Sequence, residues 1–179
     1  MGAFLERLDG VAVESTSPCG AVVARFARRE GITLKLADHK LSALSSDALS
    51  REVTAALRDV LAQADEAVRR AREPERADAA PDDLRRQPSE SAAERRRRFK
   101  DAVSAVDVVG VSAGDLVRVS WRGVVDVDVR IKPAAMYQLS AQELCESLNA
   151  AVASARMRRG LAAAGIFRKM FDGLKTAGR

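Results

Sequence analysis

Apolar and polar residues alternate along two neighbouring stretches in the second half of the chain. The apolar positions are Val117, Val119 and Trp121 in the first stretch and Val125, Val127, Val129 and Ile131 in the second. A period of two places one face on a core and the other in water, which predicts a pair of half-buried strands. Gly123 lies between the stretches, where a hairpin turn is needed. A shorter apolar run over 106–109 precedes the pair, so the pattern predicts three strands.

Helical patterns follow the strands. Ser140 and Glu143 form a capping box, which predicts a helix that begins there and ends near Arg159. In the first half the start of a helix is marked by Leu44, Ser45 and Leu49. Its apolar stripe comprises Leu49, Val53, Ala56, Leu57, Val60, Ala64, Ala67 and Ala71. Pro74 predicts that this helix ends at about Glu73, and a capping box at 91–94 predicts a short basic helix to about Ala105.

The two halves align without a gap at a constant offset of 95 residues. Identical pairs at this offset are Val11 and Val106, Val13 and Val108, Ser17 and Ser112, Val22 and Val117, Leu44 and Leu139, and Leu49 and Leu144. The first half has the same strand pattern in a weaker form, with Val22, Ala24 and Phe26 before Gly31 and Ile32, Leu34 and Leu36 after it. We therefore interpret the chain as an internal duplication of one unit.

The duplication predicts an α+β fold of two units, each a three-stranded antiparallel sheet followed by a helix. The predicted divisions are a first unit at 1–73, a charged linker with prolines at 74–90, a second unit with its preceding basic helix at 91–160, and a basic amphipathic tail at 161–179.

Charge and cysteine content limit the functional classes. The net charge of the chain is +5, which permits an anionic partner. From residue 153 onward seven bases accompany one acid, Asp172, so the C-terminal region accounts for the whole excess. Cys19 and Cys145 form no pairing motif, and no apolar signal segment opens the sequence. No stretch has the length of a membrane span. These features predict a cytoplasmic protein with free thiols.

Three segments of the second half resemble the YbaB/EbfC family of nucleoid-associated proteins. They are the turn and strand at 114–123, the strand end at 127–133, and the helix from Leu144 through Asn149 to Val152. Lys132 stands where the family usually has Asp. The resemblance implies a small bacterial α+β protein whose members dimerise in a tweezers-like shape and bind DNA with little sequence preference. Some relatives instead sit beside type VII secretion systems and act on protein partners.

This chain departs from the family pattern in two respects. It contains two units, so we expect an intramolecular pseudo-dimer, with pairing between chains as a homo-dimer as the open alternative. The long N-terminal helix of the family has no room before the first strand, since only residues 3–8 are available there. If that helix shapes the arms that grip DNA in the family, its absence here weakens the expectation that this chain binds DNA.

The leading functional hypothesis is low-specificity duplex DNA binding by a nucleoid-associated protein. Phosphate contacts from arginine and lysine give affinity without sequence readout. The candidate residues are Arg95, Arg96, Arg97, Arg98, Lys100, Arg156, Arg158, Arg159, Arg168 and Lys169. Four consecutive arginines on a helix point in all directions, so the run at 95–98 is also explained as a solvated surface. Cations at 156–159 also suit a helix C-terminus.

The alternative is a protein–protein adaptor or secretion-associated chaperone that uses the same fold without DNA. Its candidate contacts are Ile166, Phe167, Met170, Phe171 and Leu174, which have helical spacing in the tail. Catalysis is not expected, because His39 is the only histidine and Asp126 and Asp128 have no third metal ligand beside them. We therefore predict no enzyme activity, no metal, no cofactor and no small-molecule substrate.

Overall fold

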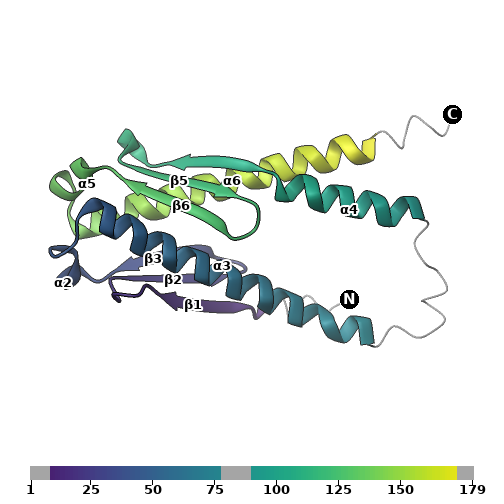
Figure 1. The fold of residues 1–179 in the computed structure, drawn as a ribbon, viewed down its shortest axis with the longest axis horizontal. Helices are drawn as coiled ribbons and strands as arrows, with labels where there is room; N and C mark the ends of the chain where they lie inside the picture. Colours follow the sequence, from purple (N-terminus) through teal and green to yellow (C-terminus); the bar gives the residue numbers. More distant parts are fainter. Residues whose placement is uncertain (1–8, 78–89, 173–179) are drawn as a thin grey trace.

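The computed structural model describes residues 9–77 and 90–172 and contains two three-stranded antiparallel sheets, each followed by helices (Figure 1). The first unit comprises β1 (Ala12–Thr16), β2 (Val22–Ala27), β3 (Gly31–Leu36), α2 (Asp38–Leu41) and α3 (Ser46–Ala77). The second comprises α4 (Glu90–Ser104), β4 (Asp107–Val111), β5 (Val117–Arg122), β6 (Asp126–Ile131), α5 (Pro133–Gln138) and α6 (Ala141–Asp172). The predicted α+β class with two similar units is confirmed.

The structural elements recur at the offset seen in the sequence. Each of the three strands, and α3, begins and ends 95 residues before its counterpart, and the pairing register is the same in both sheets. A buried serine performs the same task in each unit. The Ser17 hydroxyl accepts from the Val22 amide at 3.1 Å, and the Ser112 hydroxyl accepts from the Val117 amide at 3.0 Å. Both serines fix the turn that leads into the second strand.

The core forms where the apolar faces of the sheets meet the two long helices. Most of the alternating positions that predicted the second pair of strands are buried, with Val117, Val119, Val127 and Val129 at most 2% exposed. The prediction is wrong for Val125, which lies in the turn before β6 and is 39% exposed. Leu49 and Leu57 of α3 and Leu148 of α6 are also fully buried. The opposite face of each sheet is largely exposed and carries most of the charged residues of the strands.

Each long helix also packs beside the last strand of the other unit. α3 lies on β1 and β2 and contacts β6, while α6 lies on β4 and β5 and contacts β3. The Val129 amide of β6 donates to the Thr54 hydroxyl of α3 at 3.0 Å. The Leu34 amide of β3 donates to the Asn149 side-chain oxygen of α6 at 2.7 Å. Thr54 and Asn149 occupy equivalent positions, so the two units meet through the same contact made twice.

Both long helices extend further than the sequence predicts. The expected end of α3 at Glu73 is wrong, because the helix continues through Pro74 to Ala77. A proline this close to the helix end removes a single amide donor. The expected end of α6 near Arg159 is also wrong, since the helix runs through Gly160 to Asp172. Gly160 and Gly165 each cost about 1 kcal/mol, which is offset by the strong helix formers Leu161 to Ala164 between them and by packing on α4.

Three smaller features of the helices also differ from expectation. The short helices α2 and α5, which join the sheets to α3 and α6, were not predicted. α4 begins at Glu90, so Ser91 lies in its first turn rather than before it. The capping box of α6 is confirmed, because the Ser140 amide donates to the Glu143 carboxylate at 2.8 Å and the Glu143 amide donates to the Ser140 hydroxyl at 3.3 Å.

Candidate nucleic-acid interface

α4 and the distal half of α6 lie side by side and extend past the sheets, where they form a helical arm (Figure 1). We call residues 94–104 and 157–170 the basic arm. The rings of Phe99 and Phe167 meet edge to face, with 5.9 Å between their centroids. On α4 the half-buried residues Arg95, Phe99, Ala102 and Val103 share one helical face. This face packs on α6 and leaves the remaining positions of α4 in solvent.

The exposed face of α4 carries free positive charge. Arg96, Arg97 and Lys100 are exposed, and none lies within ion-pair distance of a described acid. Arg98 is exposed but pairs with Glu94 one turn earlier. Arg96 and Lys100 are four residues apart and therefore project from the same side of the helix. On α6, Arg168 and Lys169 are likewise exposed, with no ion pair to a described residue.

The three arginines in the middle of α6 each contact a different surface. Arg156 lies over Gly31 of β3, where any side chain would overlap its guanidinium. Arg158 donates to the Val109 carbonyl of β4 at 2.7 Å. Arg159 stacks over the Trp121 ring, with 5.3 Å from its guanidinium carbon to the ring centroid. These three contacts hold α6 against the sheets, so the structure does not bring 156–159 together with 95–100 into one patch.

Arg159 is half-buried beside the Trp121 ring. Desolvation lowers the pKa of its guanidinium, and its buried Nε has no hydrogen-bond partner among the described residues. Cation–π attraction to Trp121 compensates part of this cost. A role for Arg159 in packing therefore fits better than phosphate contact. Because α6 continues past it, the expected helix-dipole explanation for this arginine cluster does not apply.

The apolar candidates of the tail belong to the basic arm. Ile166 and Met170 are half-buried against α4, whereas Phe167 is 52% exposed despite its contact with Phe99. Phe171 lies in α6, but its side chain is not among the described ones, and Leu174 lies outside the described residues. Met157 and Leu161 were not among the predicted contact residues, although they are 62% and 67% exposed. Their spacing of four residues, one helical turn, could have identified them from the sequence.

The distal part of α3 extends past the sheets on the same side of the molecule (Figure 1). Arg69 and Arg70, its arginines with described side chains, are both paired. Arg69 contacts Asp65 at 3.0 Å and Glu66 at 3.2 Å. Arg70 contacts Glu66 at 3.1 Å. Such i,i+3 and i,i+4 pairs neutralise their own surface. The two extensions therefore differ in electrostatic character, although they come from equivalent helices.

The described residues contain no group of three or more histidine, cysteine or acidic side chains that could hold a metal ion. His39 is exposed on α2. Asp126 and Asp128 both lie on the exposed face of the second sheet. Their ion-pair partners are Arg58, at 3.1 Å from Asp126, and Arg130, at 3.5 Å from Asp128. Within 9–77 and 90–172, no helix is both long and apolar enough to cross a membrane.

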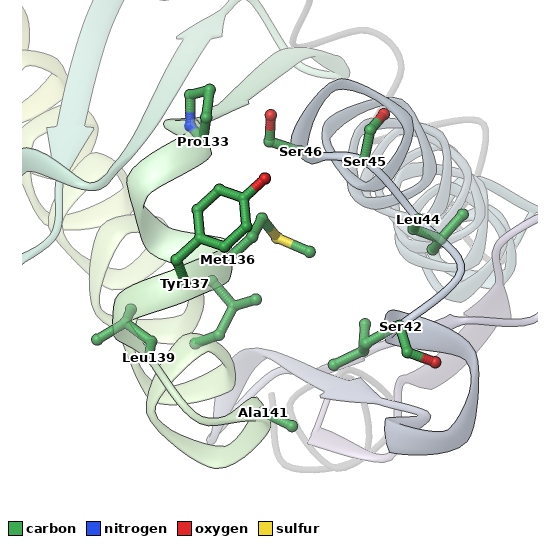
Figure 2. A pocket seen from close by; sticks show the side chains of 11 residues that line it. Ser42, Leu44, Ser45, Ser46, Pro133, Met136, Tyr137, Leu139 and Ala141 are labelled. Atoms are coloured by element: carbon green, nitrogen blue, oxygen red, sulfur yellow. The ribbon is translucent and has the colours of Figure 1, made fainter.

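A hollow of about 420 Å³ lies at the opposite end of the molecule, where α3 and α6 begin (Figure 2). Its walls include equivalent residues from both units, such as Leu44 and Leu139, with serine hydroxyls on the α3 side. Tyr137 stands at its rim and is 89% exposed. The two free cysteines contribute nothing to this hollow.

Comparison with protein-family models finds no match, and no curated protein sequence matches the chain.

Proposed function

We propose that the protein is a nucleoid-associated DNA-binding protein of the YbaB/EbfC type that binds duplex DNA with little sequence specificity. The observation that carries the proposal is the basic arm. Its exposed bases Arg96, Arg97, Lys100, Arg168 and Lys169 have no acidic partner among the described residues. Unpaired arginines and lysines on exposed helices suit phosphate contacts, which release counterions and carry no sequence information.

The proposal includes an intramolecular pseudo-dimer. It is supported by the matched contacts between Thr54 and Val129 and between Asn149 and Leu34, because both partners in one contact are offset by 95 residues from those in the other. The family that the sequence resembles dimerises from two chains, whereas here one chain supplies both units. α4 also supplies a helix before the first strand of the second unit, which is where the family has its long N-terminal helix.

Salt-dependent binding tests the proposal directly. We expect a labelled random duplex to bind with micromolar or tighter affinity at about 50 mM salt and to dissociate steeply towards about 200 mM. Replacement of Arg96 and Lys100 by alanine should weaken binding at least tenfold. The slope of log K against log salt should fall by about 0.9 for each phosphate contact that is lost. Fluorescence anisotropy measures both quantities.

The matched control lies on the other extension. Arg69→Ala combined with Arg70→Ala also removes two exposed bases, but these are already neutralised by Asp65 and Glu66. This variant should bind duplex as the parent does. Equal loss in both variants would mean that net charge alone attracts DNA, and absence of binding at low salt would reject the proposal.

The second candidate, a protein–protein adaptor, rests on the exposed apolar residues of the same arm. Met157, Leu161 and Phe167 each expose more than half of their side chain. Single exposed apolar residues are common on protein surfaces, but Met157 and Leu161 are one turn apart on one face, and adjacent exposed apolar residues mark an interaction site more often. Replacing all three by serine would abolish partner capture under this hypothesis and leave duplex binding intact under the first.

A further inference from the structure

The first strand of each sheet has one edge that faces away from the second strand. In the first unit the Arg28 amide donates to the Val11 carbonyl and the Ser17 amide donates to the Val22 carbonyl. Hydrogen-bonded positions alternate along an antiparallel pair. The backbone groups of Ala12, Glu14 and Thr16 therefore point outward, and none of them has a hydrogen-bond partner among the described residues. At the lower margin of Figure 1, β1 forms the edge of its sheet.

The corresponding edge of β4 is partly occupied by α6. The equivalent outward positions there are 107, 109 and 111, and the Val109 carbonyl accepts from Arg158. Gly110 lets the helix approach closely, since a Cβ on it would lie 2.8 Å from the Ala155 Cβ and overlap the backbone of Ala151. α6 thus covers both the face and part of the edge of β4.

Different side chains keep α3 away from β1. Ser15 takes the place of Gly110, and its hydroxyl donates to the Asp59 carboxylate at 2.5 Å. Gln63 takes the place of Arg158 but donates to the same carboxylate at 2.8 Å, so it does not reach the strand edge. A hollow of about 380 Å³ remains between the helix and the strand, with Val13, Ala62 and Ala67 as its apolar walls and Gln63, Glu66 and Arg70 as its polar ones.

We propose that the β1 edge binds an extended peptide segment of a partner protein as a fourth strand of the first sheet. The outward backbone groups require a strand, because only an extended backbone matches their spacing. The hollow beside Val13 requires an apolar side chain on the inner face of the added strand. Glu14 lies on the outer face opposite Arg25 of β2, with no ion pair to a described residue, so its carboxylate is free to attract a basic side chain from the added strand on its other side. The partner segment therefore has apolar residues at alternate positions with a lysine or arginine between them.

A second copy of this chain fits the edge less well. Full-length antiparallel pairing of two β1 strands would place Glu14 directly opposite Glu14 of the other copy. Like charges directly opposite each other destabilise such a pair. This binding site is separate from the basic arm, and it remains available whether or not the arm binds DNA.

The test uses the full chain and two fluorescein-labelled synthetic peptides of alternating valine and threonine, one with a central lysine and one with a central glutamate. We expect the lysine peptide to bind more tightly to the parent protein. Glu14→Lys should reverse this preference, with a change of about fivefold for each peptide, which corresponds to one cross-strand charge pair. Fluorescence anisotropy gives the four dissociation constants.

Proline variants separate edge binding from other contacts. Glu14→Pro removes an outward amide that no strand partner uses, so the fold should persist while peptide binding falls at least tenfold. Val109→Pro, at the equivalent position of β4, is the control and should bind the peptide as the parent does. Unchanged binding in Glu14→Pro would overturn the proposal. So would a dimer of the parent protein, detected by sedimentation, that Glu14→Pro dissociates.

Discussion

The two units contain the same elements at the same spacing, yet their long helices lie differently on their first strands. α6 approaches β4 closely at Gly110, whereas α3 is held off β1 by Ser15 and its hydrogen bond to Asp59. The repeated apolar pattern places a helix over each sheet, but the volume at a single strand position decides how closely it packs. The edge of β4 is partly covered as a result, and the edge of β1 is left free.

A second difference between the units concerns charge. Among the described side chains, Arg69 and Arg70 of α3 are neutralised by acids one turn away, while the basic arm leaves most of its bases without an ion pair. Both extensions are long exposed helices, so the fold does not require either arrangement. Duplicated units can therefore diverge in function at exposed positions while the buried positions keep the common architecture.

The largest effect is expected from closing the space that Gly110 provides. Gly110→Ala places a methyl group against the backbone of Ala151 and Ala155, and backbone cannot move aside as the end of a side chain can. Overpacking of this kind costs about 3 kcal/mol of the free energy of unfolding. Urea unfolding followed by circular dichroism measures the loss.

The matched change in the first unit is Ser15→Ala, which removes a hydroxyl without adding volume. It should cost about 1 kcal/mol, the value of one lost hydrogen bond. If Gly110→Ala were no more destabilising than Ser15→Ala, the helices would lie on their strands at similar distances. The contrast between the units would then be wrong.

A smaller effect is expected where each helix contacts the other unit. Asn149 accepts from the Leu34 amide and donates to the Leu34 carbonyl at 3.0 Å, while Thr54 only accepts from the Val129 amide. Asn149→Ala should therefore cost about 2 kcal/mol of the free energy of unfolding, and Thr54→Val about 1 kcal/mol. Each variant also leaves an edge amide unpaired. Equal losses would show that the carbonyl contact of Asn149 contributes nothing.

Hydrogen exchange shows which strand amide loses protection in each of these two variants. In Asn149→Ala the Leu34 amide of β3 should exchange faster, and in Thr54→Val the Val129 amide of β6 should do so. The remaining strand amides should stay protected. A uniform increase across both sheets would instead indicate that the units unfold together when either contact is removed.

The sequence predicted the sheets well because strand alternation is a local property. Val117, Val119 and Trp121 are buried as their period requires, and the constant offset carried the same pattern to the first unit. The contacts between units could not be predicted in this way. Asn149 bonds to a backbone 115 residues away, and nothing in the local sequence marks Leu34 as its partner.

Prediction of the candidate site from the sequence is limited in the same way, because it also depends on contacts between distant residues. Exposure of Arg96, Arg97 and Arg98 follows from helical geometry, which cannot turn four consecutive side chains to one face. The contacts of Arg158 and Arg159 depend on tertiary packing against Val109 and Trp121, which composition does not reveal. The length of α6 was also missed, because Gly160 resembles a helix end when the packing of α4 is not known.

The smallest effect is expected at the helix starts, where the two units again differ. α6 has a complete capping box, whereas α3 has Ala48 at the position of Glu143, and only the Ser45 hydroxyl accepts from its amide. The amide and hydroxyl of Ser140 hold the pKa of the Glu143 carboxyl below its usual value. A lowered folded-state pKa stabilises the protein above the unfolded pKa of about 4.3, and this contribution is lost as the pH falls through the folded value.

Glu143→Ala should therefore lower the urea midpoint at neutral pH, and the difference from the parent should shrink below about pH 4. Ala48→Glu tests the same physics in reverse, because it completes the capping box of α3 and should raise the midpoint at neutral pH only. Ala48→Gln is the control, since its uncharged side chain reaches the same amide without titrating. A Glu143→Ala difference that stays constant from pH 7 to about pH 3 would show that the carboxylate charge plays no part in the cap.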